Sequence, residues 1–277
     1  MWKQDYPAVQ PTRVGPWAVA VVTLSVALWA LIQGVQQERR ILDEQALLIA
    51  LSESAEPAPD LPDFNDIAVV QERKDQFYDF LLPIIAEENA RLLEKRAAIE
   101  AWYERVRDGQ PLPEGVVQQL IDLSARYYVD AEQALEAVLD ELLLKIDILP
   151  PSLIVAQAAN ESAWGTSRFA REGNNLFGQW CFSQGCGLVP ESRPDGEIYE
   201  VRSFEAPVLS VRSFIQNLNR HFSYETLREH RAWLRANDEP ITGLELTPHL
   251  LAYSTRREAY VAEIEGMIRF NNLQDLD

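Results

Sequence analysis

A continuous uncharged stretch near the amino terminus, residues 14–37, limits what this chain can fold into more than any other feature of the sequence. The stretch is almost wholly apolar up to Val35, with Trp17 and Trp29 within it. About 20 apolar residues cross the hydrocarbon core of a bilayer as one helix. The sequence therefore predicts a single transmembrane helix within residues 1–40.

A cleaved signal peptide is the alternative interpretation of this stretch. The apolar region of a signal peptide is usually only about 7–15 residues long, and no small-x-small cleavage motif ends this one. An uncleaved signal anchor is therefore predicted. Basic residues flank both ends of the stretch almost equally, so the positive-inside rule does not fix its orientation.

The remaining sequence has the composition of a folded, acidic protein. The 43 Asp and Glu residues outnumber the 25 Lys and Arg residues, which gives a net charge of −18. Nucleic-acid binding is excluded, because its affinity comes mostly from basic side chains on phosphates. An apolar share of 47% is enough for a sizeable core. With 2 Cys and 3 His, a Cys-rich zinc module or a disulfide-dense small domain is excluded too.

Residues 41–66 are acidic and rich in proline towards their end, which predicts an extended linker. A helical pattern follows from Phe77 onward, and Pro83 is expected to kink or break that helix. Asp130 is expected to cap a further helix over 131–146. Residues 67–150 are thus predicted to form a helical region that packs on a second domain, residues 151–277.

The second domain is predicted to begin with a helix that carries one carboxyl group among small apolar residues. Pro151 suits the first turn of a helix that continues to about Gly165. In such a helix Glu161 shares a face with Ile154 and Ala158. Burial raises the pKa of a carboxyl group, which can then deliver a proton to a leaving oxygen. On residue type alone, a solvated Glu at a helix end is the more frequent case.

Three motifs surround and follow this helix. Ala-Asn-Glu-Ser-Ala-Trp-Gly occupies 159–165, Asn-Asn-Leu-Phe-Gly occupies 174–178, and Ala-Tyr-Ser-Thr at 252–255 leads to Tyr260. Together they resemble the glucosaminidase domain, glycoside hydrolase family 73, and most closely its membrane-associated Bax-like branch. The similarity extends over roughly residues 77–273. It implies a mostly α, lysozyme-like α+β fold with a small β-hairpin lobe, behind the N-terminal transmembrane helix.

The resemblance also implies an activity and a location. It implies an endo-β-N-acetylglucosaminidase that cleaves the β-1,4 bond after N-acetylglucosamine in peptidoglycan, with Glu161 as general acid and Tyr253 beside the reacting sugar. Because that substrate lies outside the bacterial inner membrane, the catalytic domain is expected in the periplasm. No cofactor or metal is expected, and protein partners are not identified. A lytic transglycosylase, which leaves 1,6-anhydro ends, and a non-catalytic wall-binding scaffold are the alternatives.

A second carboxylate is expected on the hairpin. Asp195-Gly196 is a hairpin-turn dipeptide, and residues 198–203 alternate like a strand. Glu200 fits the Bax-like pattern best, although an exposed strand Glu is equally compatible with it. Glu191 and Glu197 remain alternatives, as does assistance by the 2-acetamido group of the substrate itself.

Aromatic and amide side chains near the motifs are candidates to line a glycan-binding groove, although most aromatic side chains of a domain lie in its core. The candidates are Trp164, Asn175, Phe177, Gln179, Trp180, Tyr199 and Tyr260. Cys181 and Cys186 are expected to form a disulfide in an oxidising compartment, whereas a reducing one favours a pair of buried thiols. Without further Cys or His nearby, this pair does not form a zinc site.

Overall fold

The computed structural model describes residues 59–112 and 114–277. All of these residues belong to one compact unit, which begins at Glu56. The predicted transmembrane anchor lies outside the described residues, as does the predicted linker up to residue 58. From residue 59 onward, no helix is both long and apolar enough to cross a membrane.

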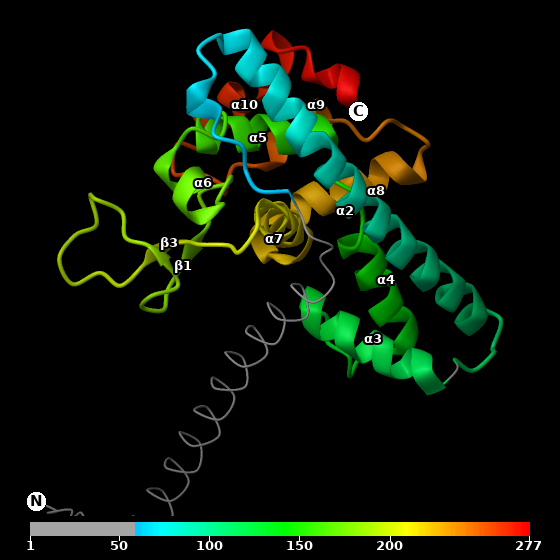
Figure 1. Ribbon diagram of the computed structural model, residues 1–277. Coiled ribbons are helices and arrows are strands. Elements are labelled where there is room, and N and C mark those ends of the chain that lie inside the picture. Colours follow the sequence, from blue (N-terminus) through cyan, green and yellow to red (C-terminus); the bar gives the residue numbers. More distant parts are fainter. Residues whose placement is uncertain (1–58, 113) are drawn as a thin grey trace, which may run out of the picture. The chain divides into compact units, whose positions relative to one another are not determined.

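The described unit is mostly helical and carries one small sheet (Figure 1). Its α-helices are α2 (Val70–Arg107), α3 (Glu114–Tyr127), α4 (Leu135–Lys145), α5 (Pro151–Ser162), α6 (Arg168–Gly173), α7 (Pro207–Arg220), α8 (Glu225–Ala236), α9 (Gly243–Leu246) and α10 (Glu258–Phe270). Short 3-10 helices occupy η1 (Phe64–Asp66), η2 (Phe222–Tyr224), η3 (Thr247–His249) and η4 (Leu273–Leu276). The predicted mostly helical fold with a small β lobe is confirmed, and its lysozyme-like arrangement stays a prediction.

The β lobe is a three-stranded antiparallel sheet in the order β1-β3-β2, rather than the two-stranded hairpin expected. The strands are β1 (Trp180–Cys181), β2 (Gly187–Leu188) and β3 (Glu200–Arg202), so the strand expected over 198–203 is shorter. The strands β2 and β3 form the expected hairpin, with Asp195-Gly196 in its loop. A Cβ atom at Gly187 would lie 1.9 Å from the Val201 carbonyl oxygen, so this pairing requires glycine.

Helix α2 runs past α4 and α5 in one shared core (Figure 1). Its residues Phe77, Leu81 and Ile85 are fully buried. Pro83 does not break this helix, because α2 continues to Arg107; a kink at Pro83 stays a prediction. A proline inside a helix removes one backbone hydrogen bond, and we attribute the continuity of α2 to the burial of its apolar face on both sides of Pro83.

Two other expected boundaries differ in the structure. Helix α4 begins at Leu135 rather than 131, because the Asp130 carboxylate accepts the Glu132 N–H (3.0 Å) in a turn ahead of the helix. The expected linker also ends early, since Phe64 is fully buried in η1. Residues 67–150 and 151–277 lie in one compact unit, in which α2, α4 and α5 share the same core.

Buried charges join α8 to the segment between α4 and α5. Asp147, which is 2% exposed, accepts hydrogen bonds from Arg235 Nε (2.7 Å) and Nη2 (2.5 Å). Arg96 of α2 lies 3.5 Å from the same carboxylate. Arg231 is fully buried and donates to the Ile148 carbonyl (2.9 Å) and to Asn219 Oδ1 (2.6 Å). This network fixes the chain just ahead of α5.

The start of α5 is held by a side chain from the other end of the sequence. The Asp277 carboxylate accepts hydrogen bonds from the backbone N–H (3.0 Å) and hydroxyl (2.6 Å) of Ser152. It also accepts the Gly243 N–H at 2.9 Å. Because a carboxylate at a helix start satisfies otherwise unpaired N–H groups, Asp277 stabilises the helix that carries Glu161.

Candidate active site

Glu161 lies in the last turn of α5 and is half-buried. Its Oε1 atom accepts a hydrogen bond from the Tyr260 hydroxyl (2.9 Å), which in turn accepts one from Gln157 Nε2 (2.9 Å). Gln157 sits one turn earlier on α5, and Tyr260 comes from α10. The donated amide proton directs the Tyr260 hydroxyl proton towards Glu161.

The pKa of Glu161 is raised, as the sequence predicts. Burial is the largest cause, because it disfavours the charged form. Hydrogen bonds from Tyr260 and Asn160 and the charge of Arg256 act in the opposite direction, but the net shift is upward. Glu161 therefore retains its proton to higher pH than a solvated Glu, which a general acid requires.

The backbone turns sharply directly after Glu161. Helix α5 ends at Ser162 rather than near Gly165, and Ala163, Trp164 and Gly165 have φ angles of 51°, 60° and 77°. The Ser162 hydroxyl donates to the Ala158 carbonyl (2.6 Å) and accepts the Gly165 N–H (2.8 Å). A run of left-handed residues is unusual outside glycine, so the surroundings must hold this turn.

Trp164 is turned towards α2 instead of lining an open surface. Its ring packs edge-on against Phe77 and Tyr78, each with centroids 5.7 Å away. The Lys74 ammonium lies 4.8 Å from the centre of the Trp164 ring. The half-buried Trp164 ring thus anchors the turn after Glu161, and its expected contact with a sugar stays a prediction.

The loop of the Asn-Asn-Leu-Phe-Gly motif faces Glu161. A Cβ atom at Gly178 would lie 3.5 Å from Glu161 Oε2. Asn175 is 2% exposed, and its Nδ2 donates to the carbonyls of Gln179 (2.9 Å) and Arg202 (2.8 Å). Phe177 is also 2% exposed and stacks on Phe214 at 4.1 Å. Both were expected to bind substrate, but their side chains point inward and shape the loop.

Tyr253 and Tyr260 lie side by side, and Tyr260 contacts Glu161; the expected place of Tyr253 beside the reacting sugar stays a prediction. The two tyrosine rings stack with centroids 5.3 Å apart. The Tyr253 hydroxyl donates to the Phe177 carbonyl (3.0 Å), which ties the segment before α10 to the Gly178 loop. Tyr260 was expected to bind substrate, but it is 1% exposed and its hydroxyl contacts Glu161 instead.

Two further aromatic side chains, Trp180 and the half-buried Tyr199, pack together on the β lobe. Trp180 is 52% exposed, and its ring centroid lies 4.4 Å from that of Tyr199. The side chain of Gln179 is held by Ser213, to whose hydroxyl it donates at 3.1 Å. Direct contacts of Gln179 and Tyr199 with a sugar stay predictions.

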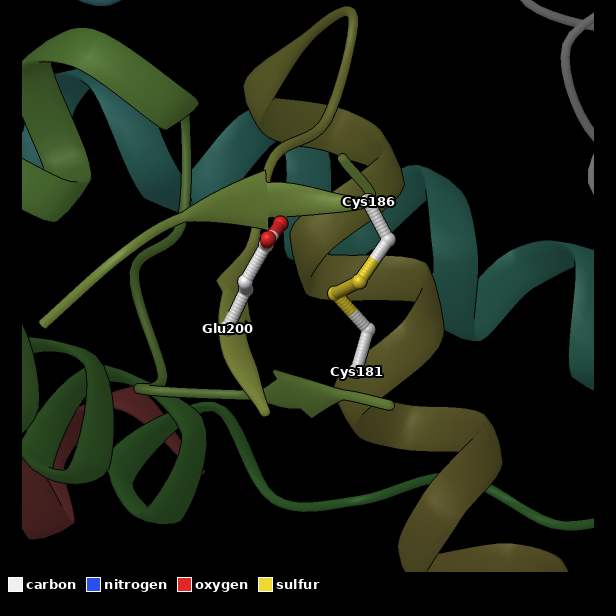
Figure 2. A group of neighbouring side chains, drawn as sticks. All are labelled: Cys181, Cys186 and Glu200. Carbon is white, nitrogen blue, oxygen red and sulfur yellow. A yellow bond between two sulfur atoms is a disulfide. The ribbon is translucent and has the colours of Figure 1, made fainter. Parts of the chain in front are cut away.

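Glu200 lies in the β lobe beside the predicted disulfide, which joins Cys181 and Cys186 (Figure 2). It is 4% exposed, and its two oxygens accept the N–H groups of Gly185 (3.1 Å) and Gly187 (2.8 Å). These hydrogen bonds lower the pKa of Glu200.

The two sulfurs and one Glu200 oxygen lie within 4.8 Å of one another. Because the sulfurs are bonded to each other, they are not thiolate ligands for a metal. In this structure Glu200 holds the loop between the two cysteines, and its role as second catalytic carboxylate stays a prediction. Glu191 and Glu197 are exposed.

The sequence alone missed three side chains around Glu161. Gln157 stands four residues earlier on the same helix face, a spacing that could have revealed it. Arg256 and Glu263 form an ion pair (2.6 Å), and the Arg256 guanidinium lies 5.7 Å from the centre of the Tyr260 ring. Their charges shift the pKa of Glu161 in opposite directions, but no local pattern in the sequence places them near α5.

Comparison with known proteins shows the family of this chain. Residues 136–273 match the glucosaminidase family model, described as mannosyl-glycoprotein endo-beta-N-acetylglucosaminidase. The chain belongs to the glucosaminidase family, glycoside hydrolase family 73. Protein bax of Escherichia coli (strain K12) is 32% identical over 222 residues, which are 79% of this chain and 77% of that protein.

A solved structure is a more distant match. It is the catalytic domain of the autolysin Auto from Listeria monocytogenes, with a TM-score of 0.36 and 21% identity. The match covers 63% of this chain and 97% of that domain.

Proposed function

We propose that this protein hydrolyses the β-1,4 bond after N-acetylglucosamine in the glycan strands of peptidoglycan, with Glu161 as general acid. The observation that carries the proposal is the Glu161 carboxyl group, half-buried between Tyr260 and Gly178 and with a raised pKa. Glycoside hydrolysis needs a protonated acid next to the leaving oxygen. Membership of the glucosaminidase family supports N-acetylglucosamine as the sugar on the non-reducing side of the bond.

The proposed location is the bacterial inner membrane, with the enzyme domain in the periplasm. The uncharged stretch at residues 14–37 supports a membrane anchor. The Cys181–Cys186 disulfide supports an oxidising compartment, because such bonds are rare in the cytosol. Amino-terminal sequencing of the mature protein tests the anchor: a chain that begins after residue 30 contradicts it.

The chemical identity of new chain ends tests the proposed bond. Purified sacculi are digested with the protein, the products are reduced with borohydride, and the ends are identified by mass spectrometry. N-acetylglucosaminitol ends are expected. N-acetylmuramitol ends would contradict the bond, 1,6-anhydro ends would indicate a lytic transglycosylase, and the absence of released fragments would indicate a scaffold.

Replacing Tyr260 by Phe should shift the high-pH limb of the kcat profile to higher pH. The Tyr260 hydroxyl stabilises the charged form of Glu161, so its loss raises the Glu161 pKa further. We also expect kcat at neutral pH to fall about tenfold, because Glu161 loses the hydrogen bond that orients it. A Tyr127→Phe variant, in a buried tyrosine of α3, is the matched control. An unchanged limb in Tyr260→Phe would contradict this role.

Replacing Glu200 by Gln tests which group assists Glu161, a second protein carboxylate or the 2-acetamido group of the substrate. Both Glu200 oxygens accept backbone N–H groups, so we expect the amide to loosen the 182–187 loop and lower activity without removing a base. Azide should then fail to restore the rate, which leaves assistance by the 2-acetamido group as the favoured route. An azide-rescued α-glycosyl product would instead make Glu200 the base of an inverting reaction.

A further inference from the structure

We propose that Phe64, which precedes α2, is a positioning residue for Glu161 and acts through the turn at residues 163–165. The proposal rests on the role of Glu161 in the proposed function and extends it to a segment that the sequence marks as linker. Phe64 does not touch the reacting groups. It acts on the backbone that directly follows the acid.

The Phe64 ring lies directly against Gly165. A Cβ atom at Gly165 would lie 2.4 Å from Phe64 Cδ2 and 2.8 Å from Cε2, so the ring occupies the space that a side chain there would need. Phe64 is fully buried. Its ring packs edge-on against Phe77 (5.5 Å) and Phe80 (6.3 Å) of α2, which hold it in place.

The short segment that carries Phe64 is itself fixed on both sides. Asp63 Oδ1 accepts the Asn65 N–H at 3.0 Å, which caps η1. The Ile67 carbonyl accepts hydrogen bonds from Arg73 Nη2 (2.8 Å) and Nε (3.2 Å). Phe64 is therefore a rigid support and not the tip of a loose linker.

The turn that Phe64 supports needs such a support. Ala163 and Trp164 are left-handed without being glycine, and residues in this region persist only where neighbouring groups hold them. Phe64 packs on Gly165, and Phe77 packs on Trp164. The turn closes onto α5 through the Trp164 N–H, which donates to the Ala159 carbonyl (3.0 Å), so it determines where the Glu161 side chain leaves the helix.

This support comes from outside the residues that match the family model. The match covers 136–273, whereas Phe64, Phe77 and Phe80 precede it. Segment 59–67 is thus part of the working enzyme unit, and a chain cut at residue 67 would lose one wall of the Glu161 turn.

The test compares Phe64→Leu with Ile99→Val, a matched control. Ile99 is fully buried in α2 but lies towards its other end. Both variants are assayed on sacculi at a temperature where circular dichroism shows them folded. Phe64→Leu should lower kcat about tenfold or more while KM changes less than about twofold, because small displacements of a catalytic group are costly. The high-pH limb of the kcat profile of Phe64→Leu should move to lower pH, since a looser turn admits water to Glu161 and so lowers its pKa. Ile99→Val should change neither.

A second comparison isolates the contact itself. Gly165→Ala should lose activity, both because its φ of 77° strains alanine and because its Cβ meets the Phe64 ring. In the double variant Gly165→Ala/Phe64→Leu the backbone strain remains, but the Phe64 ring is gone. Its kcat relative to wild type should therefore exceed the product of the two single-variant ratios by about threefold or more. Effects that simply multiply would overturn the proposal, as would equal kcat and pH profiles for Phe64→Leu and Ile99→Val.

A measurement that does not depend on enzyme activity separates this proposal from the proposed function. If the wild-type protein opens no glycosidic bond, the proposed function fails, and hydrogen exchange of the Trp164 and Gly165 amides still reports the turn. Faster exchange in Phe64→Leu than in Ile99→Val supports the hold of Phe64 on the turn. Equal exchange in the two variants overturns it.

Discussion

Replacing Glu161 by Gln should lower kcat on peptidoglycan by about 10²–10⁴-fold, the usual effect of losing a general acid. The amide keeps the shape of the carboxyl group, and its oxygen can still accept the hydrogen bond from Tyr260. It has no acidic proton to give to the glycosidic oxygen. The fold should therefore survive while turnover does not.

A matched control accompanies this variant. Glu239→Gln makes the same chemical change at an exposed position after α8, and we expect it to keep wild-type turnover. Thermal unfolding of both variants shows whether the fold is intact. Near-normal digestion of sacculi by folded Glu161→Gln protein would remove Glu161 from the mechanism.

Replacing Asp147 by Ala should lower the free energy of unfolding by about 3–5 kcal/mol, as expected when one partner of a buried ion pair is removed. Asp147 accepts two hydrogen bonds from Arg235, and its charge offsets that of fully buried Arg231. Burial lowers the pKa of Arg231 to about 10, with the Asp147 charge acting against that shift. Urea unfolding at neutral pH measures the loss. A loss under about 1 kcal/mol would show that the network contributes little.

The ion pair of Asp147 and Arg235 also predicts how the stability of the fold depends on pH. Burial alone would raise the pKa of Asp147, but hydrogen bonds from Arg235 and the charges of Arg231 and Arg96 lower it overall. A carboxylate with a lowered folded pKa contributes stability above its unfolded pKa, about 3.9, and loses that contribution as the pH falls through the folded value. The difference in stability between wild type and Asp147→Ala should therefore shrink below about pH 4. A difference that stays constant down to pH 2 would contradict this assignment.

Short-range patterns predicted two elements of the candidate site. Pro151 and the small residues after it indicated the helix of Glu161, and the spacing of Cys181 and Cys186 indicated their disulfide. Both features depend on residues within a few turns of one another. Tyr253 and Tyr260 came only from the family resemblance, because their contacts with Phe177 and Glu161 span most of the catalytic region.

Contacts between distant segments decided what the sequence could not predict. The acidic, Pro-rich composition of 41–66 predicted a linker and gave no sign that Phe64 is buried. The Phe64 ring packs against Gly165, about 100 residues later in the sequence. Nothing in the local sequence showed that the Trp164 ring packs against Phe77 and Tyr78 of α2. Strand alternation placed Glu197 and Glu200 on opposite faces. That alternation did not show that the N–H groups of Gly185 and Gly187 donate hydrogen bonds to the Glu200 carboxylate.

Digestion of sacculi in water enriched in ¹⁸O tests the hydrolytic role of Glu161 most directly. Hydrolysis adds one water oxygen at C1 of each new chain end, whereas transglycosylation closes a 1,6-anhydro ring without it. Mass spectrometry of the products should show one ¹⁸O per new N-acetylglucosamine end for the wild-type protein, and almost no such ends for Glu161→Gln. Unlabelled 1,6-anhydro ends, or labelled ends formed equally by Glu161→Gln, would contradict Glu161-dependent hydrolysis.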